Sequence, residues 1–300
     1  MAKKFFAKGK GSTFDRWLMA GIVIALVLIA LTLWGPLRSF RHAGETKTPA
    51  QTKKEPIPTK PDKKEPKKHG GSLVAGPIEK NVIVAIVIDD LGQDTKLAKE
   101  ILALPAKITL AVMPGLPHSR KVAEAAKQKN HEVLIHLPME YRSKNGKPAP
   151  GMLRSDMTPM EFLNTVSDDV ESVPGAIGIN NHEGSALTEN KEAMKFLMAE
   201  LKARNLMFLD SVTSAKTVGY TTAREFGIKT GKRDVFLDND SNNPASIRKQ
   251  FEELADIARK HGSAIGIGHP HPATISELRK WIAEAGNQGI EIVPVSRLMQ

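Results

Sequence analysis

The sequence contains no cysteine, so disulfide bonds and thiol chemistry are excluded. Aromatic side chains are scarce, with two Tyr and three Trp in 300 residues, which leaves few rings for stacking against a ligand. The formal charge is +10, but its excess lies in one part of the chain. Residues 1–72 hold 15 Lys and Arg against 5 Asp and Glu, whereas residues 73–300 hold 28 of each. The sequence therefore predicts no nucleic-acid partner for the folded part.

Several catalytic signatures are also absent. The sequence has no phosphate-binding loop of the GxxxxGK(S/T) type, no GxGxxG between a strand and a helix, no HExxH and no GxSxG. Phosphoryl transfer, dinucleotide-dependent oxidoreduction and serine hydrolysis are therefore disfavoured.

One long apolar run is present near the start of the chain. Residues 18–33 are apolar except for Thr32, and Trp17 and Trp34 flank them, where interfacial aromatic residues are favoured. The run has about the minimum length for crossing a bilayer as a helix. A cleaved signal peptide is the alternative, but no clear small-x-small cleavage site follows the run.

Basic residues precede this run, which orients it by the positive-inside rule. We expect residues 1–16 to form a cytoplasmic tail and residues 17–34 to be a single-pass signal anchor in the inner (cytoplasmic) membrane. The folded domain would then lie in the periplasm or outside. Residues 35–72 predict a disordered Lys- and Pro-rich linker, whose lysines either contact anionic lipid or envelope polymer or are merely solvated.

Residues 73–300 alternate between short apolar runs and longer segments of helical periodicity. The predicted strands are 82–88, 108–112, 132–136, 176–180, 206–210, 234–238, 264–268 and 291–295. The predicted helices are 93–104, 117–129, 158–172, 190–204, 244–261 and 273–287. This alternation indicates a parallel sheet, and eight strands in this length favour a single β/α barrel over an open doubly wound sheet.

Polar side chains stand where these strands are predicted to end, which is the edge at which active sites of both architectures form. They are Asp89, Asp90, His136, Glu140, His182, Asp210, Asp238, His269 and His271, with Arg233 just before the sixth strand. Their clustering predicts a polar site at this edge.

These residues also have structural explanations. Asp89 could cap the following helix, and His136 or His182 could be a core histidine with satisfied hydrogen bonds. Asp210 and Asp238 could organise loops. However, adjacent carboxylates after a buried strand repel each other unless a cation or proton intervenes. A carboxylate and two imidazoles form a common ligand set for zinc or a similar ion, which polarises a carbonyl and lowers the pKa of bound water.

Six ordered motifs resemble the divergent polysaccharide deacetylases, distant relatives of the NodB-type carbohydrate esterases. They are IVIDDLG at 86–92, HEVLIHLPME at 131–140, GINNHEGS at 178–185, FLDS at 208–211, RDVFLDN at 233–239 and GIGHPH at 266–271. The resemblance implies a distorted β/α barrel of the NodB-like, glycoside hydrolase/deacetylase type. It also implies removal of acetyl groups from N-acetylated sugars with a divalent metal, usually zinc.

The resemblance implies a role for each matching residue. The first aspartate of the superfamily's first motif is the base and the second binds metal, which correspond to Asp89 and Asp90. A metal-binding histidine after the third strand corresponds to His136. The histidine acid of the last motif best matches His269, and Arg233 matches an arginine that orients the base.

The chain departs from this pattern at the second metal histidine, which in the superfamily lies a few residues after the first. Either Glu140 takes its place or His182 completes the ligand set, and we favour His182 because GINNHEGS resembles the family's own motif. Asp210, Asp238 and His271 are supporting or alternative groups.

The expected function is therefore metal-dependent deacetylation of an N-acetylated cell-envelope glycan, with the inner membrane and envelope proteins as further partners. The altered ligand set favours one alternative, a non-catalytic metal- and glycan-binding or scaffolding protein in the periplasm. A third hypothesis, an amide or ester hydrolase with a non-sugar substrate, is kept open by the scarcity of aromatic residues.

Overall fold

The computed structural model describes residues 82–143 and 148–300. The predicted cytoplasmic tail, signal anchor and linker lie outside the described residues. Within the part of the chain that is described, no helix is both long enough and apolar enough to cross a membrane.

Strands and helices alternate through the described residues, as predicted. The strands are β1 (Val82–Leu91), β2 (Thr109–Val112), β3 (Val133–Met139), β4 (Gly178–Glu183), β5 (Met207–Asp210), β6 (Thr230–Lys232), β7 (Val235–Phe236), β8 (Ser263–Gly268) and β9 (Ile290–Ile292). The α-helices are α2 (Lys96–Ile101), α3 (Ser119–Gln128), α4 (Pro159–Ser172), α5 (Lys191–Ala203), α6 (Gly219–Glu225), α7 (Pro244–His261) and α8 (Pro272–Ala285). Short 3₁₀ turns are η1 (Leu187–Glu189), η2 (Gly286–Gln288) and η3 (Val295–Arg297).

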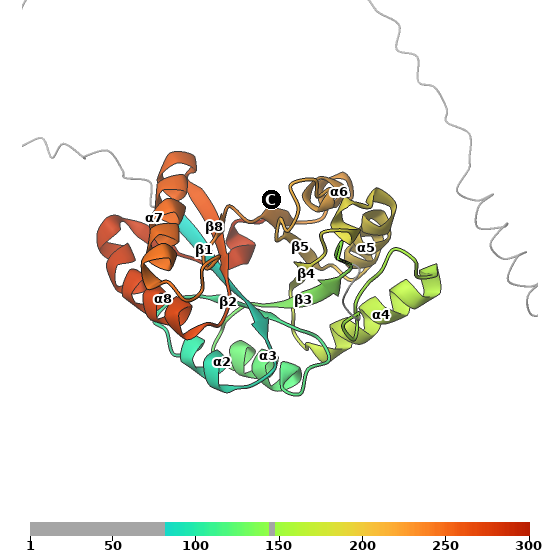
Figure 1. The fold of residues 1–300 in the computed structure, drawn as a ribbon, viewed down its shortest axis with the longest axis horizontal. Helices are drawn as coiled ribbons and strands as arrows, with labels where there is room; N and C mark the ends of the chain where they lie inside the picture. The colour runs from blue at the N-terminus through green and yellow to red at the C-terminus, as the bar shows by residue number, and fades with distance from the viewer. Residues whose placement is uncertain (1–81, 144–147) are drawn as a thin grey trace, which may run out of the picture. The chain divides into compact units, whose positions relative to one another are not determined.

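The strands form one curled parallel sheet with the order β6-β5-β4-β3-β2-β1-β8-β7. The short β9 pairs with the first residues of β1, before β2 begins its own pairing with that strand. The helices lie around the outside of the curl (Figure 1). The expected β/α barrel is therefore present as an open half-barrel, in which β6 and β7 are the two ends of the strand order.

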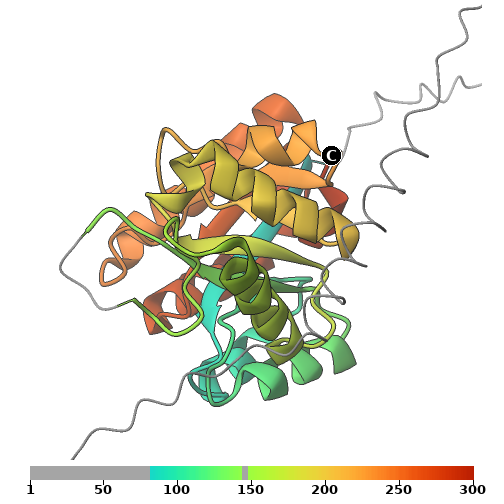
Figure 2. The ribbon, with the colours of Figure 1, turned by 90° about the vertical axis from the view of Figure 1, so that its right-hand side faces the viewer.

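The main core lies between the sheet and its helices. Residues 84–88 of β1 are fully buried, as their continuous apolar run predicts for a strand covered on both faces. On the outer side, Phe251 of α7 stacks on Trp281 of α8 with 5.2 Å between ring centroids. Helices α4 and α5 cover the other half of the sheet, as Figure 2 shows.

A second, smaller core fills the inside of the curl. Small and medium side chains of the strands, among them Ala85, Ala111 and Ile267, meet Val295 of the C-terminal segment there. Leu298 and Met299 pack against the same cluster. The backbone of Gln300 exchanges two hydrogen bonds with Thr230 of β6, so the last residues of the chain are attached inside the half-barrel.

Local signals explain several helix boundaries. Thr158 and Glu161 form a capping box at the start of α4, with Pro159 in the first turn. Asn243 caps α7, and Gly262 ends it in the left-handed conformation with φ +89°. The sequence prediction missed α6 and β6, because their short segments lack both a long helical period and a β-branched run.

Three strand ends were predicted too early, whereas the ends of β2, β5 and β8 were predicted to the residue. β1 runs to Leu91, β3 to Met139 and β4 to Glu183, each three residues past the predicted end. Backbone pairing continues through the polar residues, and His136 lies directly opposite Asn180. The polar side chains of β1, β3 and β4 therefore project from the strands themselves, whereas Asp238 and His269 lie just after β7 and β8.

Candidate metal centre

A bulge in β1 lets two consecutive aspartates approach the same histidine of β3. The register of β1 against β2 shifts between Ile88 and Leu91, and Asp90 adopts a left-handed conformation with φ +56°. In a regular strand, neighbouring side chains point to opposite faces, but a bulge redirects one of them. Asp89 and Asp90 both approach His136 of β3, with oxygen–nitrogen distances of 3.5 and 3.2 Å.

Three side chains from three strands then converge on one point. Asp90 Oδ1 lies 3.2 Å from His136 Nε2 and 3.1 Å from His182 Nδ1, and the two nitrogens are 3.0 Å apart. Ligand atoms of a tetrahedral zinc site are separated by about 3.3 Å, given bond lengths near 2.0–2.1 Å. The three atoms are therefore spaced almost as a shared ion requires.

The donor set passes a further test of fit. Asp90 Oδ1 is buried yet accepts no hydrogen bond of good geometry within the described residues. Burial opposes ionisation of Asp90, but His136 and His182 hold its pKa well below its usual range. Burial also favours the neutral His136 ring, whereas Asp89 and Asp90 raise its pKa above the ordinary value. The site thus concentrates negative charge around two imidazole nitrogens, and a divalent cation fits that arrangement.

Asp89 is buried beside this triad. Its Oδ1 accepts a hydrogen bond from Asn180 Nδ2 at 2.9 Å, and its side chain lines the pocket. Burial raises the pKa of Asp89, and the nearby imidazoles of His136 and His269 oppose that rise. A carboxylate with a raised pKa is suited to accepting a proton.

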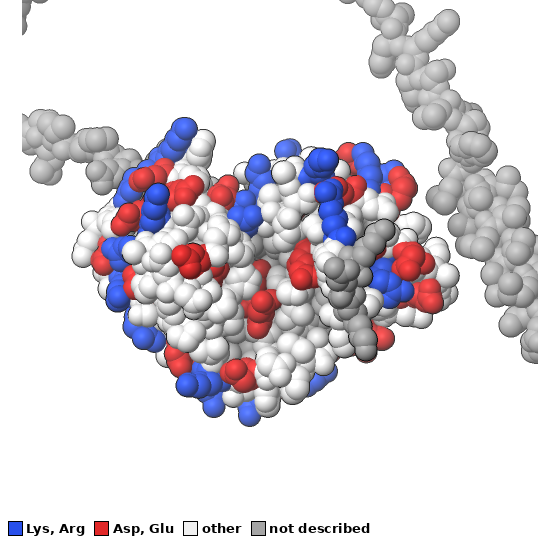
Figure 3. All heavy atoms as spheres, viewed as in Figure 1, with Lys and Arg blue, Asp and Glu red and all other residues white. Residues whose placement is uncertain are grey.

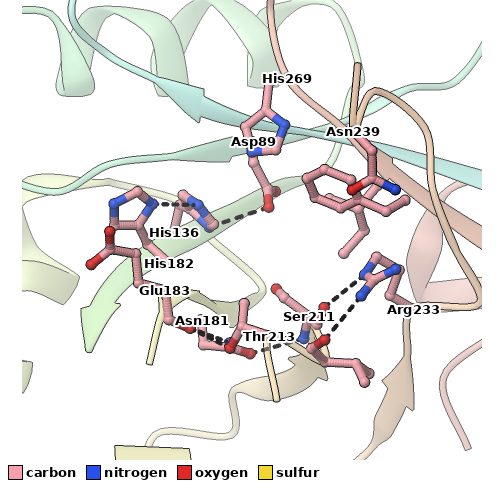
Figure 4. A pocket seen from close by; sticks show the side chains of 13 residues that line it. Asp89, His136, Asn181, His182, Glu183, Ser211, Thr213, Arg233, Asn239 and His269 are labelled. Atoms are coloured by element: carbon pink, nitrogen blue, oxygen red, sulfur yellow. Dashed lines mark hydrogen bonds and ion pairs between the residues drawn. The ribbon is translucent and has the colours of Figure 1, made fainter. Parts of the chain in front are cut away.

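His269 faces the triad from the short loop between β8 and α8. Its Nδ1 lies 3.0 Å from Asp238 Oδ1, and its Nε2 lies 3.9 Å from Asp90 Oδ2. Burial lowers the pKa of His269, but Asp238, together with Asp89 and Asp90, raises it above the ordinary value. Figure 4 shows the ring above Asp89, so its free nitrogen can reach a molecule in the pocket.

A second group, Asp238, His269 and His271, also has ligand atoms close together. Asp238 Oδ2 already accepts hydrogen bonds from the His269 backbone and from Thr274, and its Oδ1 faces the His269 ring. His271 is exposed and precedes α8. This group is better suited to orienting His269 than to holding an ion.

A pocket of about 430 Å³ lies beside the triad. Its lining includes Asp89, His136, Asn181, His182, Glu183, Ser211, Val212, Thr213, Arg233, Phe236, Asn239, Ile267 and His269. On the face drawn in Figure 3, acidic side chains lie in the central hollow and most Lys and Arg lie nearer the rim. This face therefore offers a cation site rather than a broad basic patch.

The family model of the divergent polysaccharide deacetylases matches residues 86–299. The chain belongs to this family. The match begins within β1 and takes in every residue of the candidate metal site.

Two bacterial relatives identified by sequence comparison are described only as uncharacterized proteins. The Escherichia coli protein YibQ is 46% identical over 199 residues, which cover 66% of this chain and 62% of that protein. A Haemophilus influenzae protein is 41% identical over 196 residues, which cover 65% of this chain and 69% of that protein. The chain thus spans less than two thirds of the length of the E. coli relative.

A solved structure of the same fold comes from Agrobacterium tumefaciens. This uncharacterized protein superposes with a TM-score of 0.70 at 29% identity, over 73% of this chain and 89% of its own. It supports the half-barrel and, like the two relatives, carries no stated reaction.

Three residues predicted as supporting or alternative groups, Glu140, Asp210 and Arg233, lie away from the Asp90–His136–His182 triad. Glu140 accepts hydrogen bonds from the backbone and hydroxyl of Ser155, so the structure brings His182 rather than Glu140 to the triad. Asp210 is fully buried, and its oxygens accept hydrogen bonds from the Thr217 hydroxyl, from one backbone N–H group of the following loop and from one in α6.

Arg233 is the third of these residues. Its guanidinium donates to the carbonyl oxygens of Ser211 and Val212, at 2.7 and 2.9 Å, on the opposite side of the pocket from His182 (Figure 4). No hydrogen bond joins it to Asp89 in the described part of the chain. It instead ties down a loop in which Val212 has φ +51°, an uncommon conformation for a β-branched residue.

Sequence reasoning assigned no role to Asn180 or Asn181, although both lie in GINNHEGS. Both are buried, and both make side-chain hydrogen bonds within the site. The only available signal was two amides in succession at the end of a buried strand, which does not reveal their partners.

Proposed function

We propose that this chain is a metal-dependent deacetylase of N-acetylated glycans in the cell envelope. The observation that carries the proposal is the convergence of Asp90, His136 and His182 beside a buried Asp89, with His269 across the same pocket. Membership of the divergent polysaccharide deacetylase family supports an acetylated glycan as the substrate class.

The residues divide the chemistry of amide hydrolysis among them. Asp90, His136 and His182 would hold a divalent ion, for which the nitrogen-rich ligand set favours zinc, and the ion would polarise the acetyl carbonyl and acidify water. Asp89 takes the proton of the attacking water, whose oxygen bonds to the acetyl carbon. His269 protonates the sugar nitrogen as the C–N bond breaks, so acetate and a free amine leave. Asp238 holds the His269 ring in position.

The proposed location follows from the sequence. An apolar run at residues 17–34 and the basic residues before it support a single inner-membrane anchor with the half-barrel in the periplasm. An alkaline phosphatase reporter fused after residue 300 distinguishes a periplasmic half-barrel from a cytoplasmic one. Periplasmic alkaline phosphatase activity is expected, and a cytoplasmic signal would reverse the proposed orientation.

Metal content of the purified full chain tests the site directly. We expect near-stoichiometric zinc or a similar ion in the wild type and its loss in His136→Ala, because one of three ligands is removed. His118→Ala is the matched control, since that histidine lies outside the site at the start of α3. Little metal in the wild type, even after reloading, would contradict the metallohydrolase.

A second candidate function is non-catalytic binding of metal and glycan. Its support is the departure from the superfamily's histidine pair, since Glu140 bonds Ser155 instead of the site. Asp89→Asn distinguishes the two functions. An enzyme would lose acetate release by about 10²–10⁴-fold while keeping its metal. Absence of acetate release from the metal-loaded wild type, with glycan binding retained, would favour the binding protein.

A further inference from the structure

One buried amide connects the candidate base with a candidate metal ligand. Asn180 is fully buried on β4 and lies directly opposite His136 on β3. Its Nδ2 donates to Asp89 Oδ1 at 2.9 Å and to Ser211 Oγ at 3.2 Å. Its Oδ1 lies 3.0 Å from His136 Nδ1.

The orientation of this amide follows from its neighbours. The Asn180 NH₂ group faces the oxygens of Asp89 and Ser211, which accept its two hydrogens. The reverse orientation would place two acceptor oxygens against each other. With the NH₂ group committed to Asp89, the carbonyl oxygen of Asn180 faces His136.

The carbonyl in turn biases the protonation of the ring. Because an amide oxygen accepts only, the Asn180 carbonyl favours hydrogen on His136 Nδ1, and Asp89 Oδ2 at 3.5 Å acts in the same direction. Asp90 Oδ1, 3.2 Å from Nε2, favours the other tautomer, so Asn180 acts against it. A neutral imidazole carries one hydrogen, so hydrogen on Nδ1 leaves Nε2 with its lone pair. That nitrogen is the atom 3.2 Å from Asp90 and 3.0 Å from His182 Nδ1.

We propose that Asn180 is a positioning residue that sets the His136 tautomer for metal binding and at the same time orients Asp89. This inference rests on the proposed metal site. Partners of metal-ligating histidines fix ring orientation and tautomer, and their loss typically weakens metal binding by about 10- to 100-fold. Here the Asn180 side chain contacts both His136 and Asp89. Removing it should therefore affect metal binding and the orientation of the base together.

Asn180→Leu tests the proposal, since it removes both hydrogen-bonding functions at similar volume. Asn181→Leu is the matched control. Asn181 is the adjacent residue of β4, equally buried, but its amide bonds Ser211, Thr213 and the carbonyl of Glu183 rather than His136 or Asp89. We expect zinc affinity of the full chain to fall about 10- to 100-fold in Asn180→Leu and to change little in Asn181→Leu.

The tautomer provides a readout independent of zinc and of turnover. In the metal-free full chain at alkaline pH, ¹⁵N chemical shifts of His136 should show hydrogen on Nδ1. Asn180→Leu should show a mixture of tautomers. Asn181→Leu, which leaves both hydrogen bonds of Asn180 in place, should keep the wild-type tautomer. The wild-type ring tests the proposal by itself if Asn180→Leu fails to fold.

The outcomes separate this inference from the proposed reaction. Hydrogen on Nε2 of the wild-type ring, an unchanged His136 tautomer in Asn180→Leu, or equal loss of zinc in both leucine variants would overturn it. A wild type that releases no acetate but shows the expected tautomers and zinc affinities would reject the deacetylase while leaving the role of Asn180 intact.

Discussion

At the scale of single residues, the Asp238–His269 pair makes a specific claim about pH dependence. Asp238 raises the pKa of His269 against the effect of burial. An acid is active only while protonated, so activity should fall as pH rises through this pKa. Asp238→Asn removes the charge, which should move the alkaline limb of the pH–rate profile to lower pH and reduce acetate release by about 100-fold.

Thr274→Val is the control for that variant. It removes the 2.8 Å hydrogen bond from Thr274 to Asp238 but leaves the carboxylate in place. The alkaline limb should then stay near its wild-type position. An alkaline limb that is unmoved in Asp238→Asn would remove His269 from the role of acid.

A buried carboxyl group, Asp169, should make the stability of the domain depend on pH. It lies buried on α4, its Oδ2 has no hydrogen-bond partner in the described residues, and burial, with a smaller effect of Asp168, raises its pKa to about 7. The folded state therefore holds this proton where the unfolded chain has lost it, so stability should fall between about pH 4 and pH 7. Asp169→Asn should increase the free energy of unfolding by about 1–3 kcal/mol at about pH 8 and little near pH 4.

Urea denaturation at both pH values measures this difference. Asp168→Asn is the control, since that carboxylate is less buried and perturbs Asp169 only through its charge. A stability gain of the same size at both pH values would show that the titration of Asp169 is not its source.

Individual site residues differed in how far their sequence context revealed them. Asp89, Asp90, His136, His182 and His269 stood out because chemically active side chains after buried strands have few structural uses. The role of Asn180 depends on which atoms it meets across the sheet. That information lies in strand register, which a single sequence does not specify to one residue.

At the scale of elements, β4 and β5 approach so closely that a glycine is required. A Cβ on Gly178 would lie 2.6 Å from the carbonyl oxygen of Met207. Gly178→Ala should therefore force the two strands apart and cost about 1–3 kcal/mol of stability. Thermal unfolding of both variants measures the difference. Gly286 at the end of α8 is the control, because it has helical dihedrals and no atom lies within 4 Å of a Cβ built on it. Gly286→Ala should therefore be neutral or slightly stabilising.

The long elements were predictable because their signals are strong and local. The capping box of α4 and the cap residues of α7 marked helix starts within one residue, and the run 82–88 identified the central strand. The sixth predicted strand, 234–238, shrank to the two-residue β7, and the short β6 was missed. Edge segments of this length depend on pairing with neighbours rather than on their own composition.

At the scale of the whole molecule, the sequence predicted a parallel sheet with alternating helices, but neither the short β6 nor the closure of the sheet. A closed barrel and a half-barrel have the same alternation of strands and helices. What differs here is the inside of the curl, where Val295 of the C-terminal segment fills space beside small strand residues such as Ala85 and Ala111. The sequence analysis assigned residues 291–295 to a strand and so missed this role for the end of the chain.

The C-terminal segment should therefore be essential to the domain rather than a dispensable tail. Removing residues 295–300 exposes the inner core and frees the edge of β6 at Thr230, so we expect loss of cooperative thermal unfolding. Val295→Ala should cost about 2 kcal/mol because its side chain is fully buried. Gln300→Ala should have little effect, since Gln300 bonds Thr230 only through its backbone. If the truncated chain unfolds like the wild type, the half-barrel is held by its outer helices alone.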